Sequence, residues 1–282
     1  MTALAGVYLL GVLAGLVFTD ARPPARVALA LLWPLGPLAF IVVITILLLA
    51  SLIAFPAFGA VVLAGLLGAA LFAQAPPALD ARFIGNMAYA ITDGRTTLFT
   101  DFPYQSGYSV YMEYDAREIR SSTPQSIALV THRHGDHWDR PLFEKTTWKV
   151  IGPADAVSGV DPGRVVRSLA VAPARTTVTF EGIAVEALPT PHAGIGHYSY
   201  LVTWHGRRLY FTGDTDDAGQ LLEMKNLDVA FVSPWLYQRA EKSGRRIDAR
   251  RIVIYHQTAD ETVPGCTGDC SVPAQGQTLR LR

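Results

Sequence analysis

The densest group of chemically active side chains is the run THRHGDH at residues 131–137. It places three histidines and one aspartate within six residues, directly after the apolar run SIALV. Neutral imidazole nitrogens and carboxylate oxygens are the ligands that a borderline-soft divalent metal prefers. His132 and His134 can point to one side of a loop that leaves a strand, while Asp136 and His137 can reach a second position. The run therefore predicts a metal centre, and its two pairs suit two ions.

Further ligands are needed downstream, because one cluster cannot fill two coordination shells. Three ligand-type residues occur where other apolar runs end. His192 closes the sequence PTPH, Asp214 follows the run RLYFT, and His256 follows RIVIY. The ends of separate strands thus each supply a candidate ligand.

Short apolar runs separated by turn residues are the elements that must position these ligands. Asp93-Gly94, Glu181-Gly182 and His205-Gly206 are typical of hairpin turns. The runs predict strands at 88–91, 97–99, 126–130, 177–180, 183–187, 198–204, 208–212, 229–232 and 252–255, and helices near 138–146, 216–226 and 237–250. Many hairpins with a few helices predict an α+β fold, with two packed sheets and helices outside them.

From about Arg82 to His256, the chain resembles the metallo-β-lactamase superfamily in its metal-dependent hydrolase branch. The matching motifs are HRHGDH at 132–137, the single His192, GDT at 213–215 and the late His256. The resemblance implies an αββα sandwich with the metals at one edge. It also implies a first metal site of His132, His134 and His192. The second metal site would consist of Asp136, His137 and His256. Asp214 would be the carboxylate that bridges the two metals.

The expected activity follows from that centre. Two divalent ions, zinc first and manganese as another possibility, would share a hydroxide that attacks a carbonyl or phosphorus centre. Asp136 is the candidate for proton transfer. Esters, lactones and phosphodiesters are the expected bonds, in a small-molecule or lipid-like substrate. The alternative function is a non-catalytic metal-binding sensor or accessory domain on a membrane anchor.

The other polar residues near these motifs have competing interpretations. By resemblance to the family, Asp101 supports the first histidine loop, although a turn residue at a strand end looks the same. His197 could support the metal ligands, contact substrate or only begin a strand. His205 lies in a hairpin turn, where we expect solvent exposure.

Charge is distributed very unevenly along the chain. Only three of the 48 charged residues, namely Asp20, Arg22 and Arg26, lie in residues 1–79. We therefore expect residues 1–75 to form about three membrane-spanning helices, near 3–19, 28–54 and 57–74. A linker at 76–81, the hydrolase domain at 82–260 and a tail at 261–282 would follow. Residues 80–282 have a net charge close to zero, which predicts no nucleic-acid partner.

The membrane segment leaves two alternatives open. The sequence Ala73-Gln74-Ala75 resembles a cleavage site, so the segment could instead be a signal peptide. Arg22 and Arg26 favour a cytoplasmic catalytic domain by the positive-inside rule. Cys266 and Cys270, which could pair in an oxidising compartment or stay free, favour the outer side. We expect a multi-pass membrane protein with the domain outside the cytoplasm. The arginines between 245 and 251 fit a solvated helix face or a site for anionic lipid or a phosphorylated substrate.

Overall fold

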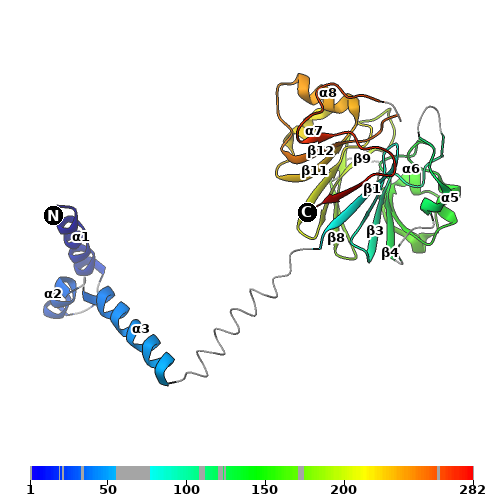
Figure 1. Ribbon diagram of the computed structural model, residues 1–282. Helices are drawn as coiled ribbons and strands as arrows, with labels where there is room; N and C mark the ends of the chain where they lie inside the picture. The colour runs from blue at the N-terminus through cyan, green and yellow to red at the C-terminus, as the bar shows by residue number, and fades with distance from the viewer. Residues whose placement is uncertain are drawn as a thin grey trace. The chain divides into compact units, whose positions relative to one another are not determined.

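The computed structural model places the predicted ligands on one unit of the chain. It describes residues 2–18, 20, 22–32, 35–54, 77–107, 112–119, 123, 125–170, 175–258 and 261–281. The chain divides into two units, Met1–Ala75 and Pro76–Arg282 (Figure 1). The second unit carries both sheets.

The first sheet has seven strands in the order β14-β1-β2-β3-β4-β5-β6. Neighbours from β14 to β3 are antiparallel, and those from β3 to β6 are parallel. The strands are β1 (Leu79–Gly85), β2 (Ala88–Thr92), β3 (Thr96–Thr100), β4 (Gln125–Leu129), β5 (Lys149–Pro153), β6 (Val165–Leu169) and β14 (Thr278–Leu281).

The second sheet also has seven strands, in the order β13-β12-β11-β10-β9-β8-β7. It is antiparallel from β7 to β10 and parallel from β10 to β13. The strands are β7 (Thr176–Phe180), β8 (Ile183–Pro189), β9 (Tyr198–Trp204), β10 (Arg207–Phe211), β11 (Leu227–Val232), β12 (Ala249–Ile254) and β13 (Cys270–Ser271).

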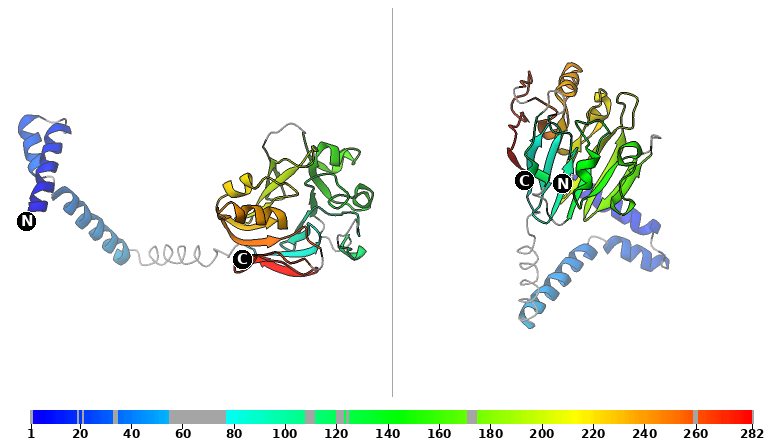
Figure 2. Two further views of the ribbon diagram at one scale, coloured as in Figure 1. Left: turned by 90° about the horizontal axis from the view of Figure 1, so that it is seen from above. Right: turned by 90° about the vertical axis from the view of Figure 1, so that its right-hand side faces the viewer.

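Helices cover the outer face of each sheet, as the two views of Figure 2 show. The largest core lies between the sheets, where Phe83, Leu129, Val185 and Phe231 are fully or almost fully buried. This arrangement is the mixed α+β sandwich that the sequence predicts. The helices are α5 (Arg140–Glu144), α6 (Ala154–Val157), α7 (Ala218–Glu223) and α8 (Pro234–Lys242), with short 3-10 turns η1 (Ala116–Ile119) and η2 (Pro162–Arg164).

The three predicted hairpins form, and their turns show why the sequence marks them. Glu181-Gly182 and His205-Gly206 both have positive φ at each residue, the geometry that tight hairpins require. The helix predicted at 237–250 is too long. Gly244, at φ 70°, follows the end of α8, so the chain turns there and enters β12 at Ala249.

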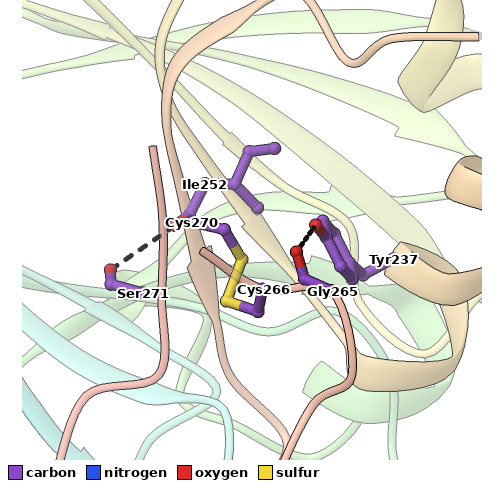
Figure 3. Close-up of a disulfide and its surroundings, with 6 residues drawn as sticks. All are labelled: Tyr237, Ile252, Gly265, Cys266, Cys270 and Ser271. Carbon is purple, nitrogen blue, oxygen red and sulfur yellow. Dashed lines mark hydrogen bonds between the residues drawn. A yellow bond between two sulfur atoms is a disulfide. The ribbon is translucent and has the colours of Figure 1, made fainter. Parts of the chain in front are cut away.

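Residues 261–281 contribute strands to both sheets. β13 pairs with β12 through Ile252 and Cys270, and β14 pairs with β1 from Leu79 to Arg82. The structure also answers the question left open for the cysteines, because Cys266 and Cys270 form a disulfide (Figure 3). Near that disulfide, the hydroxyl of Tyr237 in α8 donates to the carbonyl of Gly265 at 3.0 Å.

The described part of the first unit contains three helices, α1 (Thr2–Phe18), α2 (Pro23–Leu32) and α3 (Leu35–Ala54). α1 contacts α2 closely at Gly15, where an added Cβ would lie 3.0 Å from the Cα of Ala30. Ala30 is correspondingly buried. The tyrosine hydroxyl of Tyr8 also donates to the carbonyl of Leu31, at 3.1 Å.

The described residues do not support the spans predicted at 3–19 and 28–54. α1 has 17 residues and α2 has ten, which give about 26 Å and 15 Å of helix. Both are shorter than a hydrocarbon core of about 30 Å. The span predicted at 28–54 falls in two described helices, α2, which ends at Leu32, and α3, which begins at Leu35.

Across the residues that the structure describes, no helix combines the length and the hydropathy that crossing a bilayer requires. The multi-pass membrane location is therefore wrong. The span predicted at 57–74 and the Ala73-Gln74-Ala75 sequence lie outside the described residues.

Candidate metal centre

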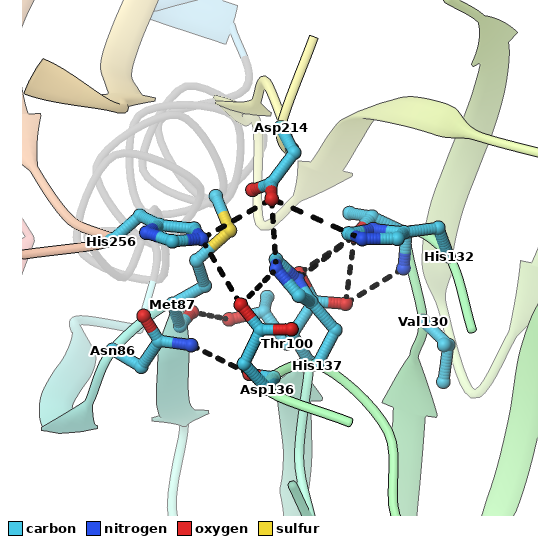
Figure 4. A network of polar contacts seen from close by, with 12 residues as sticks. Asn86, Met87, Thr100, Val130, His132, Asp136, His137, Asp214 and His256 are labelled. Atoms are coloured by element: carbon cyan, nitrogen blue, oxygen red, sulfur yellow. Dashed lines mark hydrogen bonds and ion pairs between the residues drawn. The ribbon is translucent and has the colours of Figure 1, made fainter. Parts of the chain in front are cut away.

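Four separate loops deliver the predicted ligands to one edge of the sandwich. The run at 131–137 follows β4, His192 follows β8, Asp214 follows β10 and His256 follows β12. Each loop leaves the carboxyl end of its strand, and so the ligands of distant sequence segments meet (Figure 4). The topology of the two sheets therefore brings the ligands of the site together.

The seven side chains form two groups, within each of which the ligand atoms lie within 4.8 Å of one another. The groups correspond to the two sites implied by the family resemblance, with Asp214 in the second. They are His132, His134 and His192, and Asp136, His137, Asp214 and His256.

The first group consists of imidazoles alone. Nε2 of His132 lies 2.9 Å from Nδ1 of His134, and Nε2 of His192 lies 3.5 Å from the same atom. Burial lowers the pKa of His132, and the neighbouring His137 lowers it further. Burial and His192 also lower the pKa of His134. Both side chains therefore stay neutral, which is the form that binds a metal.

Asp214 lies between the two groups. Its Oδ2 is 3.2 Å from Nε2 of His137 and 3.2 Å from Nε2 of His256. The same oxygen is 3.9 Å from Nε2 of His132, in the first group. Oδ2 of Asp136 completes the second group at 3.5 Å from Nε2 of both His137 and His256. Asp214 is thus the side chain that can contact ions in both sites.

The hydrogen bonds of His137 indicate whether this arrangement of residues fits a metal. Its Nδ1 lies 3.1 Å from Oδ2 of Asp101 and donates there, because a carboxylate only accepts. Once Nε2 gives up its proton, as metal binding requires, it presents a lone pair on the side of Asp214. Nε2 of His137 and Oδ1 of Asp214 are buried, and neither has a hydrogen-bond partner among the described residues. A cation between such acceptors would satisfy them, so the residues fit a metal.

Charge at the second group favours cation binding as well. Burial opposes ionisation of Asp214, but His137 and His256 outweigh it and hold the pKa of that carboxyl well below its usual range. Burial likewise works against His137, whose pKa is nevertheless raised by Asp214 and Asp101. Without an ion, protons on the histidines balance the carboxylates. A divalent ion would replace these protons when it binds.

Asp101 anchors the histidine loop from the end of β3. Its Oδ1 accepts from the backbone N–H of Thr131 at 2.7 Å, and its Oδ2 accepts from the Thr131 hydroxyl at 2.9 Å. The contact with His137 described above fixes the orientation of that ring. Asp101 thus reaches a histidine of the second group, whereas its contact with the first histidine runs through Thr131.

His197 positions Asp214 instead of joining either ligand group. Burial lowers its pKa to about 3, so the ring is neutral. Its Nδ1 lies 2.7 Å from the Thr190 hydroxyl, and its Nε2 accepts from the backbone N–H of Asp214 at 2.9 Å. Gly213 permits this approach, because a Cβ there would lie 2.4 Å from Nε2 of His197.

His205 lies away from the ligands, but the expectation of solvent exposure is wrong. Only 28% of its side chain is exposed, and its Nε2 lies 2.8 Å from Oδ2 of Asp93. These two residues belong to the turns of the β2–β3 and β9–β10 hairpins. The pair therefore joins one sheet to the other, a contact that the local turn sequence does not reveal.

Asn86 is a supporting residue that the sequence analysis missed. It lies fully buried between β1 and β2 with φ 52°. Its Nδ2 donates to the carbonyl of Asp136 at 2.6 Å, and its own carbonyl accepts from the backbone N–H of His256 at 2.7 Å. Asn86 thereby ties two ligands from distant loops together (Figure 4). In the local sequence, Asn86 is only an asparagine between two strands, which is also typical of an ordinary turn.

We expect Asn86→Ala to weaken binding of the second ion by about 10- to 100-fold, the usual loss when support of a metal ligand is removed. The first group, which Asn86 does not contact, should keep its ion. The measurement is a competitive zinc titration that resolves two affinities.

Asn226→Ala is the matched control, since Asn226 also has positive φ, 54°, but is exposed, directly before β11. Equal weakening in both variants, or none in Asn86→Ala, would show that Asn86 does not position the ligands.

A pocket of about 630 Å³ opens beside the first group. His192 and the following turn form one wall, and the segment after Asp214 forms another. Arg239 of α8 lies on its rim and pairs with Asp216 at 3.4 Å. The pocket is large enough for a small molecule next to the ligands.

Comparison with known proteins identifies the family of this part of the chain. A family model described as "Beta-lactamase superfamily domain" matches residues 112–267, more than half of the chain. The matched range includes all seven ligand-type residues. A metal-dependent hydrolase of Deinococcus radiodurans is 26% identical over 214 residues, covering 69% of this chain and 89% of that protein.

Two solved structures share the fold. One is Igni18, a metallo hydrolase from Ignicoccus hospitalis, with 15% identity, a TM-score of 0.54, and coverage of 73% of this chain and 99% of that one. The other is the metallo-β-lactamase fold protein YhfI from Bacillus subtilis, with 14% identity, a TM-score of 0.52, and coverage of 72% and 99%. Identities this low show a common fold and nothing about substrate.

Proposed function

The chain belongs to the β-lactamase superfamily, and on that premise we propose that it is a hydrolase whose centre holds two divalent ions. Zinc is the expected metal, with manganese as the second choice, because imidazole suits zinc and both metals accept carboxylate. The observation that carries the proposal is the position of Asp214, within 3.9 Å of ligand atoms in both groups.

The proposed reaction is the addition of water across an ester, lactone or phosphodiester bond. When bound, the two ions would lower the pKa of the attacking water and stabilise charge on the substrate oxygen. The chain itself supplies Asp136 as proton acceptor. Burial disfavours its ionisation, but contacts with His137 and His256 keep its pKa well below the ordinary value. Asp136 is therefore an anion at neutral pH. Because the low pKa makes it a weak base, its proposed role rests on its position in the second group.

The pocket beside His192 supports a small substrate. Its walls combine apolar side chains, such as Leu222, with the guanidinium of Arg239 and the carboxylates of Asp216 and Asp217. The adjacent first group would face a scissile bond lying in this pocket. A polar or anionic portion of the substrate would meet Arg239.

A substrate panel tests the proposed function. The full chain, loaded with zinc or manganese, would be assayed on p-nitrophenyl phosphodiesters, acyl esters and lactones. We expect turnover of at least one bond class, with loss on chelation and recovery when metal is restored. A folded, metal-loaded protein that hydrolyses none of the three classes would contradict the hydrolase proposal and favour a binding role for the centre.

A further inference from the structure

A second polar site lies at the end of the sandwich opposite to the metal centre. A pocket of about 430 Å³ occupies the edge where β10, β11 and β12 begin. Asp214 and His256 follow the other ends of β10 and β12, about 17 Å away along each strand. Seven of the described residues line the pocket, namely Arg207, Asp228, Val229, Arg250, Arg251, Arg280 and Leu281.

Two of these arginines occupy positions that face the space between the sheets. Side chains alternate along a strand, so Arg207 shares a face with Leu209, and Arg251 shares one with Val253. Leu209 and Val253 are both fully buried in the core between the sheets. Val229 pairs with Leu209 on one side and with Arg251 on the other. Arg207 and Arg251 therefore border the same apolar floor.

The positive charge of the pocket is only partly balanced. Asp228, the one acidic side chain among the lining residues, lies 3.4 Å from Arg250 and accepts from the backbone N–H of Arg208 at 2.8 Å. Arg280 pairs with Asp80 outside the pocket at 3.9 Å. Within the described part of the chain, neither Arg207 nor Arg251 forms an ion pair, and the buried Nε of Arg207 has no hydrogen-bond partner. A buried donor without a partner is rare in proteins and needs an explanation.

We propose that this pocket binds a phosphate-type anion between Arg207 and Arg251. The planar guanidinium group presents a fork of N–H donors that can bind two oxygens of a phosphate group, and two unpaired cations supply the charge. The volume accommodates pyrophosphate or the phosphate of a small molecule. The site is separate from the metal centre and does not depend on the proposed hydrolysis.

Calorimetric titration of the full, metal-loaded chain with inorganic pyrophosphate tests the site. The double variant Arg207→Gln/Arg251→Gln should bind pyrophosphate at least about tenfold more weakly, since each lost charge-assisted hydrogen bond typically accounts for that much. Zinc content and hydrolysis should remain unchanged. A second titration with the metals chelated separates the two sites, because the arginine-dependent binding should persist there.

The matched control is Arg95→Gln/Arg167→Gln, which removes the same charge from exposed positions elsewhere. Arg251→Lys, which keeps the charge but loses the forked donor, should give intermediate weakening and covers the case in which the double variant fails to fold. Equal weakening by both double variants would indicate general charge attraction and overturn the proposal. So would wild-type protein that binds no pyrophosphate at millimolar concentration.

Discussion

Asp214→Asn should release the second ion while largely retaining the first, and turnover should fall by about 100-fold or more. Removal of a residue that only supports a metal ligand typically lowers metal affinity or activity by about 10- to 100-fold. Asp214 contacts the ligand groups directly, so its loss should have a larger effect. Its Oδ2 lies 3.2 Å from Nε2 of both His137 and His256. An asparagine would present one neutral oxygen there.

The loss should be selective because of charge. Two dications held close together repel each other, and an anion between them offsets that repulsion. The three imidazoles of the first group carry no charge to replace it, but they can hold one ion without Asp214. The fold should survive, since the backbone N–H of residue 214 would still donate to His197. Metal content by elemental analysis, turnover, and circular dichroism measure these three outcomes.

Asp216→Asn is the matched control for metal content. Asp216 lies two residues further along the same loop, but 72% of its side chain is exposed and it pairs with Arg239. It should retain both ions. If Asp214→Asn also retains two ions and near-normal turnover, Asp214 is not the bridge, and the assignment of two sites around it fails.

The ligand set could be predicted from the sequence because its residue types are rare in combination and follow apolar runs. Histidine or aspartate follows β4 in one sheet and β8, β10 and β12 in the other, but only the fold shows that these four strand ends meet at one edge of the sandwich. The αββα layering follows from the same runs and hairpin turns. Positions such as Asp101 and His197 were visible as polar residues near ligands, but their partners, Thr131 and Asp214, required the fold.

Contacts between distant segments could not be predicted in this way. Asn86 acts through Asp136 and His256, 50 and 170 residues further along the chain, and no local pattern encodes those contacts. The Asp93–His205 pair joins two hairpin turns for the same reason. β13 has only two residues, so its apolar pattern is too short to indicate a strand.

The N-terminal prediction failed for a different reason. Hydropathy shows the length of an apolar segment but not where the helices within it begin and end. The segment from 28 to 54 is uniformly apolar, yet α2 ends at Leu32 and α3 begins at Leu35. The prolines in this segment, at 34 and 37, were treated as tolerable within a span. Pro37 lies within α3, whereas Pro34 falls outside the described residues.

The number of bound ions tests the central claim most directly. The full chain would be purified, saturated with zinc, freed of excess metal and analysed for zinc per folded chain, with turnover measured on the same sample. Because seven ligand-type side chains exceed what one tetrahedral site can use, we expect close to two ions per chain. Stepwise chelation should remove turnover as the ions are lost. One ion or none in folded, zinc-saturated protein with full turnover would contradict the two-ion centre.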